Sequence, residues 1–110
     1  MNIQESVKTC FAKYVDFSGR ASRSEYWWFV LAEVIVLLVT GFIHQYVYFL
    51  AALALILPAL AVGARRLHDI GKSGWFLLLG LIPIANFVLL YFLVQPTQPE
   101  SNAHGAPPVS

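Results

Sequence analysis

The chain has 110 residues, of which 58% are hydrophobic and only 12% are charged, whereas soluble domains carry about 45–50% apolar and about 25% charged residues. Seven Lys and Arg nearly balance six Asp and Glu, so a broad cationic surface of the kind that binds nucleic acid is not expected. Cys10 is the single cysteine, which excludes an intramolecular disulfide and a cysteine-based zinc site. The composition predicts one small all-α integral membrane domain over residues 1–110.

The first segment, residues 1–19, is predicted to contain an amphipathic helix. Its apolar residues recur at helical spacing between residues 2 and 17, and Asn2 and Glu5 resemble a cap pair. Such a helix can lie in the membrane interface against anionic lipid. The alternative is a helix packed on the cytoplasmic loop.

Three apolar segments follow, and each is predicted to be a transmembrane helix. Residues 26–43 contain one charged residue, and residues 46–64 and 75–94 contain none. A hydrocarbon core of ~30 Å needs about 17–25 apolar residues, so each segment is long enough to cross it. The connection between the first two is so short that they must form a tight antiparallel hairpin.

The basic residues set the predicted orientation. They lie before the first span (Lys8, Lys13, Arg20, Arg23) and in the loop 65–74 (Arg65, Arg66, Lys72). By the positive-inside rule, the N-terminus is cytoplasmic and the proline-rich, flexible tail 95–110 lies on the outer, periplasmic side. An alternative is a re-entrant hairpin broken at Pro83 and Asn86, which would keep the tail in the cytoplasm.

The cations at the two cytoplasmic crossing points form the candidate binding site. Ammonium and guanidinium groups at headgroup level bind phosphates through charge-assisted hydrogen bonds. We expect anionic lipid headgroups or an acidic segment of a partner protein to bind there. The proposed set is Arg20, Arg23, Arg65, Arg66, His68 and Lys72.

Three other residues support a structural alternative for the same region. Ser22 and Glu25 have the S-x-x-E spacing of a capping box at the start of the first span. Glu25 and Asp69 are also acids among the cations, and internal ion pairs would fix the loop against the first span. The sequence leaves the ligand site and the internal pairing open.

Glu33 is the one acid inside an apolar segment, and burying it in lipid costs about 2.5–3.5 kcal/mol on insertion scales. Asn86 lies at a similar predicted depth, and Pro58 leaves the carbonyl of Ala54 without its helical donor. We expect an intramembrane polar node of Glu33, Asn86 and the Ala54 carbonyl, with Glu33 protonated. The alternative is that Glu33 carries a proton or binds a cation during transport.

Catalytic chemistry has little support in the sequence. His68 and Asp69 are neighbours, but adjacent residues on a helix point about 100° apart. The three histidines are scattered at positions 44, 68 and 104. We therefore expect no enzymatic activity, no metal site and no cofactor.

Two motifs, "FSGRASRSEYWWFVL" and "RRLHDIGKSGWFLLLGLIP", together with the proline-rich end that holds Asn102 and Gly105, carry a family resemblance. The chain resembles the DUF805 family of small bacterial inner-membrane proteins, although Phe76 stands where the second motif usually has Trp. The resemblance implies a multi-pass protein of the bacterial inner (plasma) membrane, and it brings no activity or ligand.

Two classes of function remain from the sequence. The first is a structural or regulatory membrane component whose cytoplasmic arginine-rich face binds anionic lipid headgroups or a partner protein. The second is a small oligomeric transporter that uses Glu33 for proton or cation coupling. Three spans enclose little volume, which is compatible with assembly as a homo-oligomer.

Overall fold

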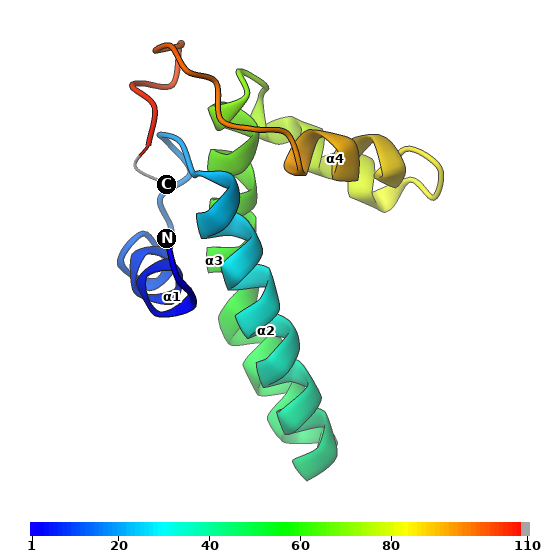
Figure 1. The fold of residues 1–110 in the computed structure, drawn as a ribbon. Helices are drawn as coiled ribbons and strands as arrows, with labels where there is room; N and C mark the ends of the chain where they lie inside the picture. Colours follow the sequence, from blue (N-terminus) through cyan, green and yellow to red (C-terminus); the bar gives the residue numbers. More distant parts are fainter. Residues whose placement is uncertain (109–110) are drawn as a thin grey trace.

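The computed structural model describes residues 1–108, which form four α-helices and one 3-10 helix and no β-strand. In chain order these are α1 (Ile3–Ala12), α2 (Arg23–Ile43), α3 (Gln45–Asp69), η1 (Gly74–Leu81) and α4 (Asn86–Leu93). Figure 1 shows α2 and α3 as a long antiparallel pair, with α1 beside them and α4 projecting sideways at one end. We call the end where α2 begins and α3 ends the head. The all-helical class is confirmed.

The two longest helices, α2 and α3, form the hairpin. Its helices have 21 and 25 residues, which correspond to about 32 and 38 Å at ~1.5 Å per residue. Only 6% of the most apolar window of α2 is buried, and 33% of that of α3, whereas the core helix of a soluble protein is mostly buried. Two helices are therefore long and apolar enough to cross a membrane, as the sequence predicts for the first two spans.

His44 joins these two helices in a single residue. It is the last cap of α2 and the first cap of α3, in an extended conformation with φ −169°. Its ring Nδ1 accepts the backbone N–H of Tyr46 at 3.1 Å. An imidazole acceptor of this kind satisfies one of the N–H groups that every helix start leaves free.

The loop predicted over 65–74 is shorter in the structure, because α3 continues to Asp69. Hydropathy falls at Arg65, but the helical hydrogen bonds continue to Asp69. The helix ends where Gly71 adopts φ +77°, a left-handed conformation that favours glycine. The N–H groups of Gly71 and Lys72 close this end on the carbonyls of His68 and Leu67.

The third predicted span, 75–94, is not one helix. The structure divides it into η1 and α4, which have eight residues each and lie against one another. At ~2.0 and ~1.5 Å per residue these are about 16 and 12 Å long, too short to cross ~30 Å of hydrocarbon. The break falls at Pro83, which has no N–H to continue a helix, so a third continuous transmembrane helix is absent from residues 1–108.

The core lies at the head and consists of two clusters of buried side chains. One joins α1, the start of α2 and α3 (Cys10, Ala21, Phe29, Leu55 and Val62), and the other joins α3 to α4 (Leu67, Leu89 and Leu93). The predicted amphipathic helix is α1, and it buries Ser6 and Cys10. Asn2 caps it by accepting the N–H of Glu5 at 2.8 Å, as predicted. The packing of α1 on α2 and α3 fixes it to the hairpin.

Candidate functional site: a buried arginine cluster at the head

Five charged side chains at the head form a cluster that is almost sealed from solvent. Its members are Arg20, Glu25, Arg65, Arg66 and Asp69, and none is more than 5% exposed. They come from the segment before α2, the first turn of α2 and the last turns of α3. Buried charges of this kind are stable only when they are paired and hydrogen-bonded, so the partners of each group define what the cluster does.

Asp69 is the centre of the cluster because it binds two arginines at once. Its Oδ1 lies 3.0 Å from Nε of Arg20, and its Oδ2 lies 2.8 Å from Nη1 of Arg66. Arg20 precedes α2 and Arg66 belongs to α3. One carboxylate therefore joins the beginning of the hairpin to its end.

Glu25 and Arg65 make the second link between the same two helices. The Nη1 of Arg65 lies 2.5 Å from Oε2 of Glu25, and the carbonyl of Arg65 accepts the N–H of Ala21 at 2.9 Å. Ser6 of α1 donates to the carbonyl of Glu25, which adds the first helix. Within the described residues, Nε and Nη2 of Arg65 have no hydrogen-bond partner.

The tail closes the cluster with backbone carbonyls. Nη1 of Arg20 donates to the carbonyls of Glu100 and Gly105 at 3.0 and 2.9 Å, and its Nη2 donates to that of Gln98 at 2.8 Å. Arg66 likewise donates to the carbonyls of Leu93 and Gln95. Residues 95–105 therefore make contacts with the head, whereas the flexibility expected of the tail 95–110 stays a prediction; the last two residues of that segment lie outside the described range.

His68 extends the contact between the tail and the head. Its Nδ1 lies 2.9 Å from the carbonyl of Gly19, and its ring stacks on that of His104 with centroids 3.8 Å apart. The side-chain amide of Asn102 donates to the carbonyl of His68 at 3.0 Å. The predicted binding residue His68 is thus held among backbone groups of the head.

The cations available to a lipid surface differ from the predicted set. Arg20, Arg65 and Arg66 are buried, and each pairs with an internal carboxylate instead of facing outward. Arg23 and Lys72 of that set are exposed. Arg23 donates to the carbonyl of Val94 at 3.2 Å, and the Nζ of Lys72 lies 5.5 Å from the ring centroid of Phe92.

The predicted capping box forms only in one direction. Ser22 is the N-cap of α2, and its hydroxyl accepts the N–H of Glu25 at 3.1 Å. The side chain of Glu25 does not return to the cap but pairs with Arg65. A buried cation attracts the carboxylate more strongly than a cap N–H does.

The predicted polar node inside the membrane does not form. The carbonyl of Ala54 accepts a hydrogen bond from the hydroxyl of Tyr14. Glu33 and Asn86 are both half-buried, and within residues 1–108 no side-chain hydrogen bond joins either of them to another group. The misplacement follows from α4, which runs beside the head instead of along the hairpin.

Chemically, this arrangement binds the parts of the head together. Three arginines against two acids leave a net charge of +1 (3 − 2), and the carbonyl oxygens of the tail stabilise the excess positive charge. Sequence reasoning missed these carbonyls, because backbone acceptors leave no signal in the residue types. No group of three or more His, Cys, Asp or Glu side chains suited to a metal occurs in the part of the chain that the structure covers.

The chain has relatives of matching length among bacterial membrane proteins. Inner membrane protein YhaI of Escherichia coli is 42% identical over 103 residues, covering 86% of this chain and 87% of the relative. Inner membrane protein YhaH of the same organism is 36% identical over 107 residues, covering 86% and 88%. No solved structure matches the chain. The family model described as "Protein of unknown function (DUF805)" matches residues 14–106, which include the whole arginine cluster. The chain therefore belongs to the DUF805 family of inner-membrane proteins.

Proposed function

We propose that the chain is a structural component of the inner membrane that crosses it twice. Its head, which internal ion pairs and hydrogen bonds hold together, would lie on the cytoplasmic side. The observation that carries the proposal is that Arg20 binds Asp69 and three tail carbonyls at one time. Those contacts require the segment before α2, the end of α3 and the tail to share one side of a membrane. All seven basic residues lie at this end, in α1 or directly after α1, and none lies near His44, which favours a cytoplasmic head.

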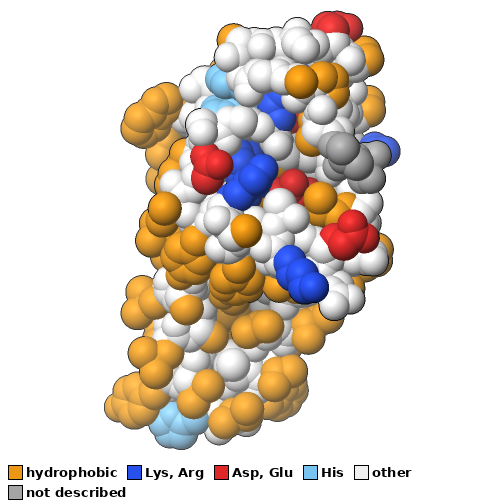
Figure 2. Space-filling view, turned by 90° about the vertical axis from the view of Figure 1, so that its left-hand side faces the viewer, with side chains coloured by type: hydrophobic (Ala, Val, Ile, Leu, Met, Phe, Trp, Pro, Cys, Tyr) orange, Lys and Arg blue, Asp and Glu red, His pale blue; other side chains and the backbone are white. Residues whose placement is uncertain are grey.

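The exposed cations give this head a second role, which is to bind anionic lipid headgroups. Lys8, Lys13, Arg23 and Lys72 are exposed. Figure 2 shows charged side chains over the upper part of the molecule and hydrophobic ones over the lower part. A Lys or Arg near an anionic surface contributes about 1 kcal/mol. The transporter alternative has no comparable support, since Glu33 has no polar partner within residues 1–108.

Cysteine labelling from outside the cell tests the two-span topology. Single cysteines replace Lys13, Gln45 and Ser101, each exposed, in a Cys10→Ser background. A membrane-impermeant maleimide on spheroplasts should label only the cysteine at position 45, and the other two only after permeabilisation. Labelling of position 101 together with position 45 would show that the chain crosses a third time and would overturn the proposal.

Lipid retention tests the binding of headgroups independently of topology. The variant that replaces Lys8, Lys13 and Lys72 with Gln removes three exposed charges, and the variant with Arg at all three positions keeps them. Native mass spectrometry from nanodiscs of equal phosphatidylglycerol and phosphatidylcholine reads the bound lipid. We expect each lost charge to reduce the preference for phosphatidylglycerol up to about fivefold. An unchanged preference in the Gln variant would refute the lipid role.

A further inference from the structure

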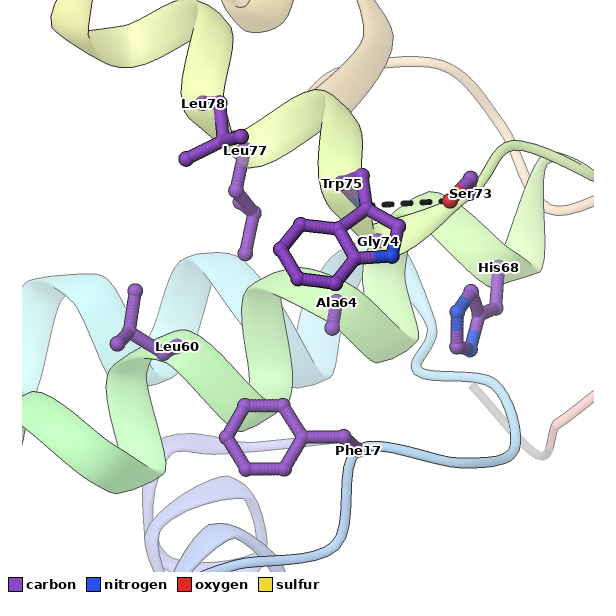
Figure 3. Close-up of a pocket in the computed structure, with 9 residues that line it drawn as sticks. All are labelled: Phe17, Leu60, Ala64, His68, Ser73, Gly74, Trp75, Leu77 and Leu78. Atoms are coloured by element: carbon purple, nitrogen blue, oxygen red, sulfur yellow. Dashed lines mark hydrogen bonds between the residues drawn. The ribbon is translucent and has the colours of Figure 1, made fainter.

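A pocket of about 450 Å³ opens beside the head, between α3 and η1. This volume lies within the range of small-molecule sites, about 300–1,000 Å³. Leu60, Ala64 and His68 of α3 line one side, and Leu77 and Leu78 of η1 line the other, while Phe17 closes one edge. Figure 3 shows these side chains around a common space.

The pocket has an apolar end and a polar end. Leu60, Ala64 and His68 are four residues apart, so they follow one face of α3 over about 12 Å. In Figure 3 the hydroxyl of Ser73, the indole nitrogen of Trp75 and the ring of His68 gather at one end, opposite the leucines. The polarity therefore changes along the axis of α3, from the middle of the hairpin towards the head.

The wall of the pocket is fixed by close packing. A Cβ at Gly74 would lie 3.0 Å from the Cβ of Ala64, and a Cβ at Gly63 would lie 3.0 Å from Cδ2 of Leu77. Two contacts between η1 and α3 thus depend on glycine. Because these contacts hold η1 against α3, they also fix the two walls of the pocket relative to one another.

We propose that this pocket binds one acyl chain of a bilayer phospholipid, with its ester and headgroup at the polar end. Two observations indicate this occupant. The polarity of the pocket changes along α3 as the polarity of a phospholipid changes from its acyl chain to its headgroup. Several pocket-lining side chains are also exposed on the protein surface, so a lipid can reach them from the bilayer. Leu60 is 43%, Leu78 54% and Trp75 78% exposed, and Trp belongs to the interfacial belt where chain and headgroup meet. The site rests on the proposed membrane role, because only a spanning hairpin puts the polar end at headgroup level.

Photo-crosslinking tests the site. The full chain is reconstituted in vesicles of phosphatidylethanolamine and phosphatidylglycerol with a small fraction of phosphatidylglycerol that carries a diazirine in one acyl chain. After illumination, mass spectrometry of the peptides should find adducts concentrated on the pocket-lining residues of α3 and η1. Adducts spread evenly along α2 and α3 would indicate ordinary lipid contact and would overturn the site.

Matched tryptophan variants separate occupancy from general effects. Leu60→Trp fills the pocket, whereas Leu57→Trp changes the same residue type on the same helix at nearly equal exposure, 42%, outside the pocket. We expect Leu60→Trp to reduce adducts on η1 about fivefold, because the indole occupies the space of the chain, and Leu57→Trp to leave them unchanged. Leu78→Trp should repeat the loss from the opposite wall if Leu60→Trp folds poorly. Equal labelling in all three variants would refute the site.

Alkaline carbonate extraction of the same vesicles distinguishes the two proposals. A chain that stays in the membrane but lacks focused adducts would overturn the pocket and leave the proposed function standing. A chain that carbonate removes would overturn the membrane role, and the pocket with it.

Discussion

Replacing Asp69 with Asn should strongly destabilise the head, because this one carboxylate pairs with two buried arginines. The carboxylate is fully buried and holds Nε of Arg20 at 3.0 Å and Nη1 of Arg66 at 2.8 Å. The amide keeps the shape but removes the charge, and its NH2 group faces one of the two guanidinium groups. Breaking a buried pair by removal of one partner costs about 3–5 kcal/mol. For a domain of this size the melting temperature should fall by on the order of 10 °C or more.

The assay is thermal unfolding in detergent by circular dichroism, combined with limited trypsin digestion. Trypsin should cleave Asp69→Asn after Arg20 and Arg66 faster than it cleaves the unchanged protein, because both arginines lose their anchor. Glu100→Gln is the matched control, since it also removes one carboxylate but leaves the carbonyl of Glu100 on Arg20. Equal melting temperatures for Asp69→Asn and Glu100→Gln would refute the idea that Asp69 holds the head together.

Three more predictions concern single residues. Burial raises the pKa of the Cys10 thiol to about 11, so maleimide should label it at pH 8 only after denaturation, as intact mass would show. Because the folded chain holds this proton more tightly, its contribution to stability should be constant below pH about 9 and decline towards pH 11. Gly71→Ala and Gly19→Ala should each cost about 1–2 kcal/mol, because φ is +77° and +82° at these positions. Gly71→Ala should cost more, because its Cβ would also lie 3.2 Å from the amide of Gln98, whereas a Cβ at position 19 meets open space; thermal melts compare the two. Trp27→Phe removes the donor 3.0 Å from the carbonyl of Leu93 and should cost about 0.5–1.5 kcal/mol in the same melts, because Arg66 still donates to that carbonyl.

The sequence predicted the hairpin because hydropathy and helix capping agree there. Residues 26–43 and 46–64 fall within α2 and α3, and Ser22 caps α2 as expected. The third span failed because hydropathy measures only the preference for lipid, whereas Pro83 and the glycines of η1 determine whether the backbone continues as one helix. The same run of apolar residues can form one straight helix or two short helices packed together, and its hydropathy does not distinguish the two.

The sequence grouped the arginines of the two crossing points, but it left open whether they bind a ligand or pair with internal acids. Positive-inside reasoning counts Arg20, Arg65 and Arg66 with the exposed lysines, since it uses charge and position only. Their burial depends on pairing with Asp69 and Glu25, which the sequence offered as one of two alternatives, and on the tail carbonyls, which it did not indicate. Internal pairing was therefore predictable as a hypothesis, and the closure by residues 95–105 was not.

The use of tail carbonyls by Arg20 also dictates the order in which the molecule is completed during synthesis. Arg20 leaves the ribosome before the hairpin, but its acceptors at Gln98, Glu100 and Gly105 leave it more than seventy residues later. In the proposed two-span topology, both long helices can enter the bilayer while this guanidinium still binds water. The arginine cluster can therefore be completed only after the final segment has been translated.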